Sequence, residues 1–188
     1  MTPPTHFFIN WLAANTANLE RRDRAIVTIS GIVPDLDGLG LVADLLMNND
    51  KDYLPLYDEF HHVLAHNLAF VFLAAFFGFM LARKRWITAL LVFAVLHIHL
   101  LGDIAGGGGR DGYKWPIFYL WPFLKNFQLT WSGQWTLSSW QNILISIIAI
   151  SITIFLAWKR GYSPLEMISA KADKAFVETL RRRFGQNH

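Results

Sequence analysis

The sequence predicts an all-α protein that crosses a membrane several times as a bundle of helices. Hydrophobic residues make up 53% of the 188-residue chain and charged residues only 16%, whereas ordinary soluble domains carry about 25% charged residues. The apolar residues are gathered in long runs, and several of these runs end in clusters of arginine and lysine. Long apolar runs with basic ends are typical of membrane-spanning helices.

The first apolar stretch is interrupted. Residues 1–24 are mixed in character and end in a basic cluster at 21–24, and residues 25–47 are apolar except for PDLDG at 34–38. The apolar segments on either side of that motif are too short to span separately, because a spanning helix needs roughly 20 residues. We therefore expect a broken or re-entrant pair of half-helices here, followed by a polar loop.

Three clear spans follow, at residues 64–82, 86–104 and 140–158. The basic sequence at 83–85 separates the first two, which we expect to form a tight antiparallel hairpin. Residues 106–139 are rich in Trp, Pro and Gly. This connection is aromatic enough to lie at the lipid–water interface.

The tail, residues 163–184, alternates apolar and charged positions at helical spacing and ends in three arginines. This pattern predicts an amphipathic helix on the membrane surface. We divide the chain into a membrane-embedded unit, 1–160, and a basic amphipathic tail, 161–188. The positive-inside rule places the basic clusters on the cytoplasmic side of the membrane. The net charge of +3 forms no single patch, so we expect the lipid bilayer, and no nucleic acid, as a partner.

Polar residues interrupt the apolar sequence in four places: His6; Asp35 and Asp37; His61, His62 and His66; and His99 with Asp103. His99 and Asp103 are four residues apart and share one helix face. Measured along the hairpin from its basic turn, His66 and His99 lie at about 26 Å and 21 Å, near the same, non-cytoplasmic end. The chain has no cysteine, so a metal ion here would be held by imidazole and carboxylate groups.

Each of these polar groups also has a simple structural explanation. The PDLDG string is typical of a turn, and His99 with Asp103 can be a polar contact between helices. Each of these explanations accounts for one polar group by itself. None explains why the groups are expected at the same depth in the membrane, and we therefore favour a metal site. Helical geometry pairs His62 with His66, whereas His61 converges with them only if it precedes the helix. The spacing leaves that choice open.

The order of these motifs resembles a known family. The chain reads T-H at 5–6, PDLDG at 34–38, H-x-x-x-x-H at 61–66 and H-x-x-x-D at 99–103, followed by a glycine-rich loop and W-P. This order resembles the inner-membrane-associated metal-dependent hydrolases, some of which are described as LexA-binding. That family is similar in motif order to zinc-dependent phospholipase C and the P1-type nucleases, which hold several zinc ions. The resemblance covers residues 5–123.

The resemblance implies ligands for divalent ions, zinc first and manganese as an alternative: His6, Asp35, Asp37, His61, His66, His99 and Asp103. It favours His61 over His62. The implied activity is hydrolysis of a phosphoester, in a lipid or another amphiphilic substrate, by metal-activated water. Asp35 and Asp37 would act as catalytic residues that bridge ions or orient the water. The chain departs from the family where Gly38 replaces a frequent histidine and where HHVLAHN stands for HRGxTHS.

The glycine-rich loop offers a place for an anionic group. Backbone amides at 106–109, together with Arg110 and Lys114, are candidates for substrate binding, although contact with lipid headgroups explains them equally well. Two other functions remain open. Buried His and Asp also form ion pathways, so a small metal-ion or proton transporter is the main alternative, although the chain has no inverted repeat. An inactive membrane scaffold with a relict metal site is the other.

Overall fold

The computed structural model describes residues 1–47, 63–109 and 112–185, and the regular secondary structure of this part of the chain is helical. It contains seven α-helices and two 3₁₀ segments: α1 (Pro3–Ala14), α2 (Arg21–Ser30), η1 (Val33–Leu39), α3 (Gly40–Met47), α5 (Leu68–Leu81), α6 (Arg85–Gly106), α7 (Trp140–Arg160), η3 (Pro164–Met167) and α8 (Ala170–Phe184). The described residues contribute two isolated β-bridges and no strand. The prediction of an all-α fold is confirmed.

Two of the described helices are long and apolar enough to cross a membrane. They are α6, with 22 residues, and α7, with 21 residues. At 1.5 Å per residue both are about 32 Å long, which matches a hydrocarbon core of about 30 Å. The spans predicted at 86–104 and 140–158 are confirmed.

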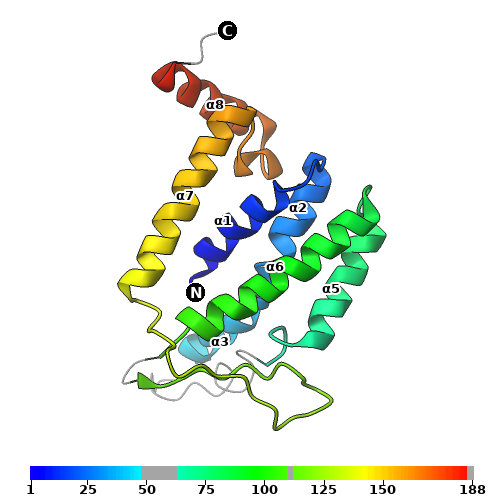
Figure 1. Ribbon diagram of the computed structural model, residues 1–188, viewed down its shortest axis with the longest axis vertical. Helices are drawn as coiled ribbons and strands as arrows, with labels where there is room; N and C mark the ends of the chain where they lie inside the picture. Colours follow the sequence, from blue (N-terminus) through cyan, green and yellow to red (C-terminus); the bar gives the residue numbers. More distant parts are fainter. Residues whose placement is uncertain (48–62, 110–111, 186–188) are drawn as a thin grey trace.

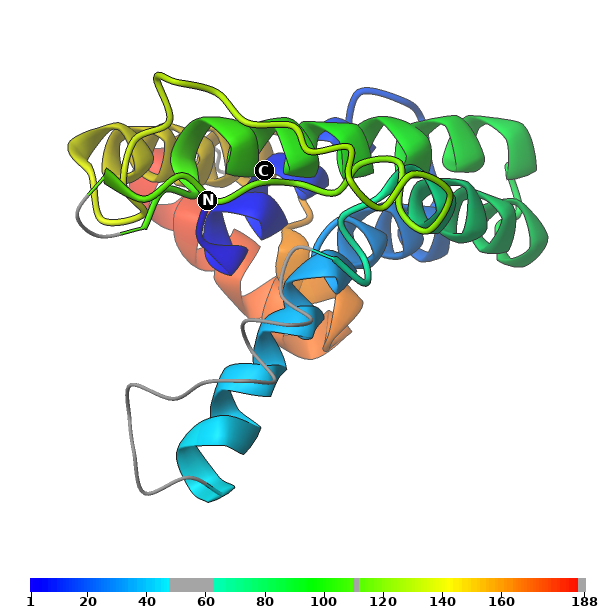
Figure 2. The same ribbon diagram turned by 90° about the horizontal axis from the view of Figure 1, so that it is seen from below.

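The N-terminal segment is broken as the sequence predicts. Helix α2 and the segment formed by η1 and α3 meet at an angle of 43°, and together they count as a third candidate span. The break follows Gly31, and Pro34 lies in the first turn of η1. Proline lacks the N–H group that would continue the ladder of α2. Figure 2 shows α3 projecting away from the other helices.

The segment expected to span at 64–82 is shorter than predicted. Helix α5 has 14 residues, which is about 21 Å. Asn67 sets its start, because the Asn67 side chain accepts a hydrogen bond from the Phe70 backbone N–H at 2.8 Å and so acts as the N-cap. Residues 63–67 consequently lie in turns and bends before the helix.

The α5–α6 hairpin turns where the sequence places its basic cluster. The backbone N–H groups of Arg83 and Lys84 donate to the two carboxylate oxygens of Asp23, at 3.0 and 2.8 Å. This contact fixes the turn against α2. Figure 1 shows the turn at the same end of the bundle as the start of α2 and the end of α7. All three basic segments therefore lie at one end; that this end is cytoplasmic stays a prediction.

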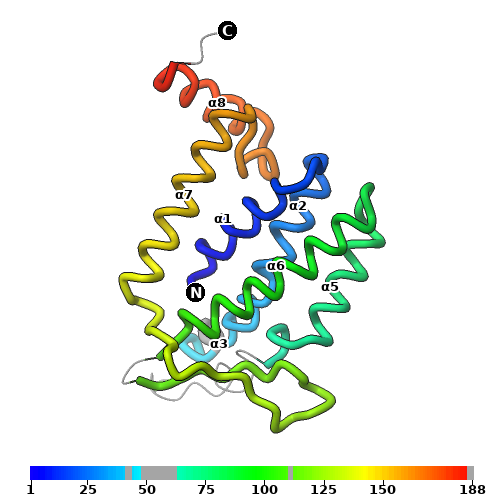
Figure 3. The backbone as a smooth tube through the Cα atoms, in the orientation of Figure 1, coloured from blue at the N-terminus to red at the C-terminus, as the bar shows by residue number. Residues whose placement is uncertain are grey.

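The hydrophobic core lies among α1, α2, α5 and α6. Val27, Val71, Val92 and Leu96 are fully buried in it. The backbone tube in Figure 3 shows α1 beside α2, and α1 also packs on α6 and α7. Helix α1 therefore brings its side chains into the centre of the bundle.

The tail contains the predicted helix. Helix α8 follows η3, and η3 is tied to α2 because the Arg24 guanidinium forms two hydrogen bonds of 2.7 Å with the Glu166 carboxylate. Arg24 also lies over the Tyr162 ring, 4.0 Å from its centroid. These contacts cross the boundary proposed at residue 160. That boundary, and the position of α8 on the membrane surface, stay predictions.

Candidate metal centre

Four polar side chains converge where α6 ends, at the end of the bundle opposite the basic segments. His6 of α1, Asp35 of η1, and His99 and Asp103 of α6 each offer one ligand atom, and these atoms lie within 4.8 Å of one another. The two histidines and Asp103 are buried, and Asp35 is partly buried. The group, called here the His/Asp cluster, assembles four of the seven ligands expected from the sequence.

His99 is held in a defined orientation. Its Nδ1 lies 2.9 Å from the Gly31 carbonyl oxygen. Because a carbonyl oxygen only accepts, Nδ1 is the donor in this contact, and Nε2 is the ring atom directed at the cluster. That Nε2 lies 3.1 Å from Asp103 Oδ2. The spacing of one helical turn thus places both groups together, as the sequence predicts.

His66 lies directly beside the cluster. Its Nε2 is 3.2 Å from His99 Nε2 and 3.3 Å from Asp103 Oδ2, and its Nδ1 is 2.8 Å from Asp37 Oδ2. A carboxylate behind an imidazole is the usual arrangement around metal-binding histidines. Burial lowers the pKa of His66, but the carboxylates of Asp103 and Asp37 raise it to about 9. The Nε2 atoms of His66 and His99 face each other beside the Asp103 carboxylate.

His6 completes the arrangement from α1. Its ring stacks on that of His99 with centroids 3.8 Å apart, and its Nε2 is 3.1 Å from Asp103 Oδ1, which the Met1 amino group also contacts. Burial lowers the pKa of His6 to about 4, which keeps the ring in the neutral form that binds metal ions. A Cβ atom at Gly102 would lie 3.1 Å from His6 Cε1, so this glycine leaves room for the ring.

The donor atoms fit a cation. The Oδ2 atoms of Asp35 and Asp103 are buried and have no hydrogen-bond partner, although Asp103 Oδ2 lies close to two imidazole nitrogens. Asp103 Oδ1 contacts the Met1 amino group, whereas Asp35 has no lysine, arginine or terminal amino group paired with it among the described residues. A buried carboxylate without a compensating charge is costly. A divalent ion would supply that charge, and mixed imidazole and carboxylate ligands suit zinc.

Two polar side chains that the sequence analysis did not select hold the end of α6. Gln134 donates from Nε2 to the Asp103 carbonyl oxygen at 2.9 Å and accepts at Oε1 from the Trp115 N–H, also at 2.9 Å. Asn142 donates from Nδ2 to the Gly106 carbonyl oxygen at 2.8 Å. Isolated amides in an aromatic connection form no recognisable pattern, so the sequence carried no signal for them.

Three of the residues discussed above lie outside the described part of the chain: His61, its alternative His62, and Arg110. Lys114 is described, and its Nζ donates to the Gln134 carbonyl oxygen at 2.5 Å. The role of Lys114 in substrate binding stays a prediction, and so does the metal-binding role of His61.

The fold and the cluster together define a class: a helical membrane protein with a buried group of His and Asp that can hold a metal ion. The chain belongs to the YdjM inner membrane protein family, whose model matches residues 1–172. The predicted location in the inner membrane is confirmed. No curated protein matches the chain, and no solved structure matches it either.

Proposed function

We propose that this protein is a membrane-embedded metal-dependent hydrolase that cleaves a phosphoester of a lipid or another amphiphilic substrate. The observation that carries the proposal is the facing of His66 Nε2 and His99 Nε2 at 3.2 Å beside the Asp103 carboxylate. Three electron-pair donors directed at one another inside an apolar bundle require a cation or a proton between them. His6 and Asp35 add two more donor groups at the same point.

The residues would divide the work as follows. His6, Asp35, His99 and Asp103 would hold a divalent ion, zinc or manganese, and His66 would add a ligand or bind a second ion. Asp37 would fix the orientation of His66 through their 2.8 Å contact. A divalent ion bound here would polarise the phosphoryl oxygen and lower the pKa of its water toward about 7. Asp35, the most exposed of the four ligands with 14% of its side chain accessible, would accept a proton from the attacking water.

The surroundings favour an amphiphilic substrate. The connection between α6 and α7 exposes large apolar side chains, among them Phe123 at 81% and Trp131 at 46%. Aromatic side chains of this kind lie at membrane interfaces. The connection lies beside the end of α6 that carries the His/Asp cluster (Figure 1). A lipid-linked phosphoester has its cleavable bond at this depth, and by the positive-inside rule this would be the non-cytoplasmic face.

The test is turnover by the full chain purified in detergent. Phosphatidic acid and phosphatidylglycerol in mixed micelles serve as substrates, and released phosphate or glycerol phosphate is measured. We expect turnover that a chelator removes and added zinc or manganese restores. Asp35→Asn should abolish it, while His97→Gln should retain it, because His97 binds the Phe93 carbonyl oxygen and the Tyr119 hydroxyl instead of the cluster.

Turnover that survives both the chelator and Asp35→Asn would refute the proposal. Metal-ion flux into sealed vesicles, with no hydrolysis of either lipid, would identify a transporter instead. Tight metal binding with neither activity would identify a scaffold that retains the site without its chemistry. The same preparations serve all three measurements.

A further inference from the structure

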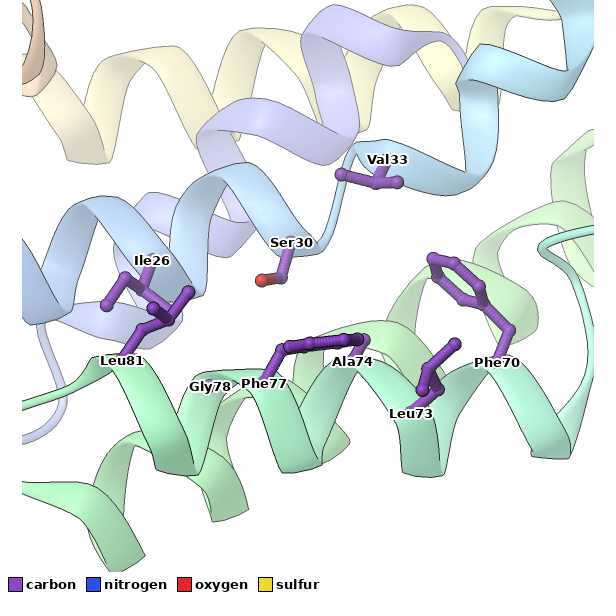
Figure 4. A pocket seen from close by; sticks show the side chains of 9 residues that line it. All are labelled: Ile26, Ser30, Val33, Phe70, Leu73, Ala74, Phe77, Gly78 and Leu81. Carbon is purple, nitrogen blue, oxygen red and sulfur yellow. The ribbon is translucent and has the colours of Figure 1, made fainter.

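A groove lined almost entirely by apolar side chains runs between α2 and α5. Its volume is about 260 Å³. Ile26, Ser30 and Val33 line it from α2 and η1, and Phe70, Phe77 and Leu81 are among the residues that line it from α5 (Figure 4). Phe77 and Leu81 are 52% and 53% exposed, so the groove is open along one side.

One end of the groove adjoins the His/Asp cluster. Val33 and Phe70 lie at that end, and Ile26 and Leu81 lie at the other (Figure 4). Val33 precedes Asp35 by two residues within η1, and Phe70 follows His66 by four. On the α2 and η1 side and on the α5 side alike, the lining residues run from near the cluster toward the basic turn between α5 and α6.

The dimensions of the groove fit one hydrocarbon chain. From Phe70 to Leu81 the helix rises about 16 Å, close to half of a hydrocarbon core of about 30 Å. Ser30 is the one polar side chain among its lining residues. A groove of this composition in a membrane protein offers nothing to a headgroup but matches an acyl chain over one leaflet.

We propose that the groove between α2 and α5 binds the hydrocarbon chain of a lipid whose polar head lies at the His/Asp cluster. The inference rests on the proposed function only in treating this lipid as the substrate. The groove would then select substrates by chain length, since each additional methylene group that packs against its walls adds van der Waals contacts. A substrate without a long chain would bind only through its head.

The test uses phosphatidylglycerol with a photoreactive diazirine at the end of one acyl chain, added to the full chain in detergent. We expect labelling on α5 within 68–81. Ser30→Phe places a ring in the groove and should reduce labelling about tenfold, because the acyl chain loses its packing contacts there. Ser151→Phe is the matched control, because Ser151 is an exposed serine on α7. Ala74→Phe is a second filling variant, used with thermal unfolding to verify folding.

Labelling of Ser30→Phe and Ala74→Phe at the wild-type level would overturn the inference, as would labelling spread equally over α6 and α7, which indicates surrounding lipid only. His99→Ala should lose the metal ion but keep the labelling. The experiment can therefore refute the proposal for the groove and the proposal for the metal site independently. Where turnover is measurable, Ser30→Phe should raise KM for long-chain substrates and leave kcat and the KM for short-chain substrates unchanged.

Discussion

His66 and His99 face each other through their Nε2 atoms at 3.2 Å, and the Nδ1 of each ring contacts an oxygen on another segment. His99 Nδ1 donates to the Gly31 carbonyl, and His66 Nδ1 contacts Asp37. Both rings therefore direct their remaining nitrogen at the same point. The arrangement explains why the Gly31 carbonyl, directly after α2, and the Asp37 carboxylate on η1 matter to a site on α6.

Gly31→Ala should disturb the site through Asn10. A Cβ atom at Gly31 would lie 2.3 Å from Asn10 Nδ2, so the backbone that supports His99 must move. We expect a loss of stability of about 1–3 kcal/mol and about a tenfold loss of metal affinity. Thermal unfolding and titration with zinc measure the two effects.

Removing the obstructing side chain provides the control. The Asn10 amide has no hydrogen-bond partner among the described residues, so Asn10→Ala removes the obstructing atoms without breaking a hydrogen bond. The double variant with Gly31→Ala and Asn10→Ala should recover most of the metal affinity. A double variant as weak as Gly31→Ala alone would show that the collision is not the cause.

Asp37→Asn should weaken the site without removing it. Asp37 contacts His66 Nδ1 at 2.8 Å, and loss of such a carboxylate typically costs about 10–100-fold in metal affinity. Asp35→Asn removes a member of the cluster and should have the larger effect. Equal metal affinities for Asp37→Asn and wild type, measured by competition with a chelator, would place His66 outside the site.

Gln134→Leu should loosen the end of α6. The variant loses the bond to the Asp103 carbonyl oxygen and both bonds to Trp115, which leaves buried backbone groups unsatisfied at a cost of about 1–3 kcal/mol. Gln128 is exposed, and Gln128→Leu should change stability by less than about 0.5 kcal/mol. Thermal unfolding in detergent compares the midpoints of the two variants. Equal decreases in midpoint would refute the structural role assigned to Gln134.

The buried pair of Arg24 and Glu166 should stabilise the attachment of the tail. Arg24→Met leaves Glu166 buried without its partner, and the expected cost is about 3–5 kcal/mol. The exposed pair of Arg83 and Glu20 is the comparison, since breaking such a surface pair costs about 0–1 kcal/mol. Metal content should stay unchanged in both. A similar small loss in both variants would show that η3 is not held by this contact.

Much of the fold could be predicted from the sequence because an apolar run with basic ends can form few structures in a bilayer other than a spanning helix. The spans at α6 and α7 and the break near Pro34 followed directly. The length of α5 did not, because its start is set by a single hydrogen bond from the Phe70 N–H to Asn67. Hydropathy does not detect a cap inside an apolar stretch.

The candidate site could be predicted in part for a similar reason. His99 and Asp103 share one helix face by spacing alone, and equal depth along the hairpin brought His66 to the same end. His6 reaches the cluster because α1 packs against α6. The spacing of residues along the sequence does not predict that packing. Gln134 binds backbone groups with its side-chain amide, and Gly31 contributes its own carbonyl oxygen. Both contributions depend on contacts between distant segments instead of on a motif.

The most direct test of the metal centre is elemental analysis of three detergent-purified proteins: wild type, His99→Ala and His97→Ala. The two histidines lie two residues apart on α6, but only His99 belongs to the His/Asp cluster. We expect about one or more zinc or manganese ions per chain in wild type and His97→Ala, and background levels in His99→Ala. Equal metal content in all three, or no metal in any after growth and titration with both ions, would contradict the account.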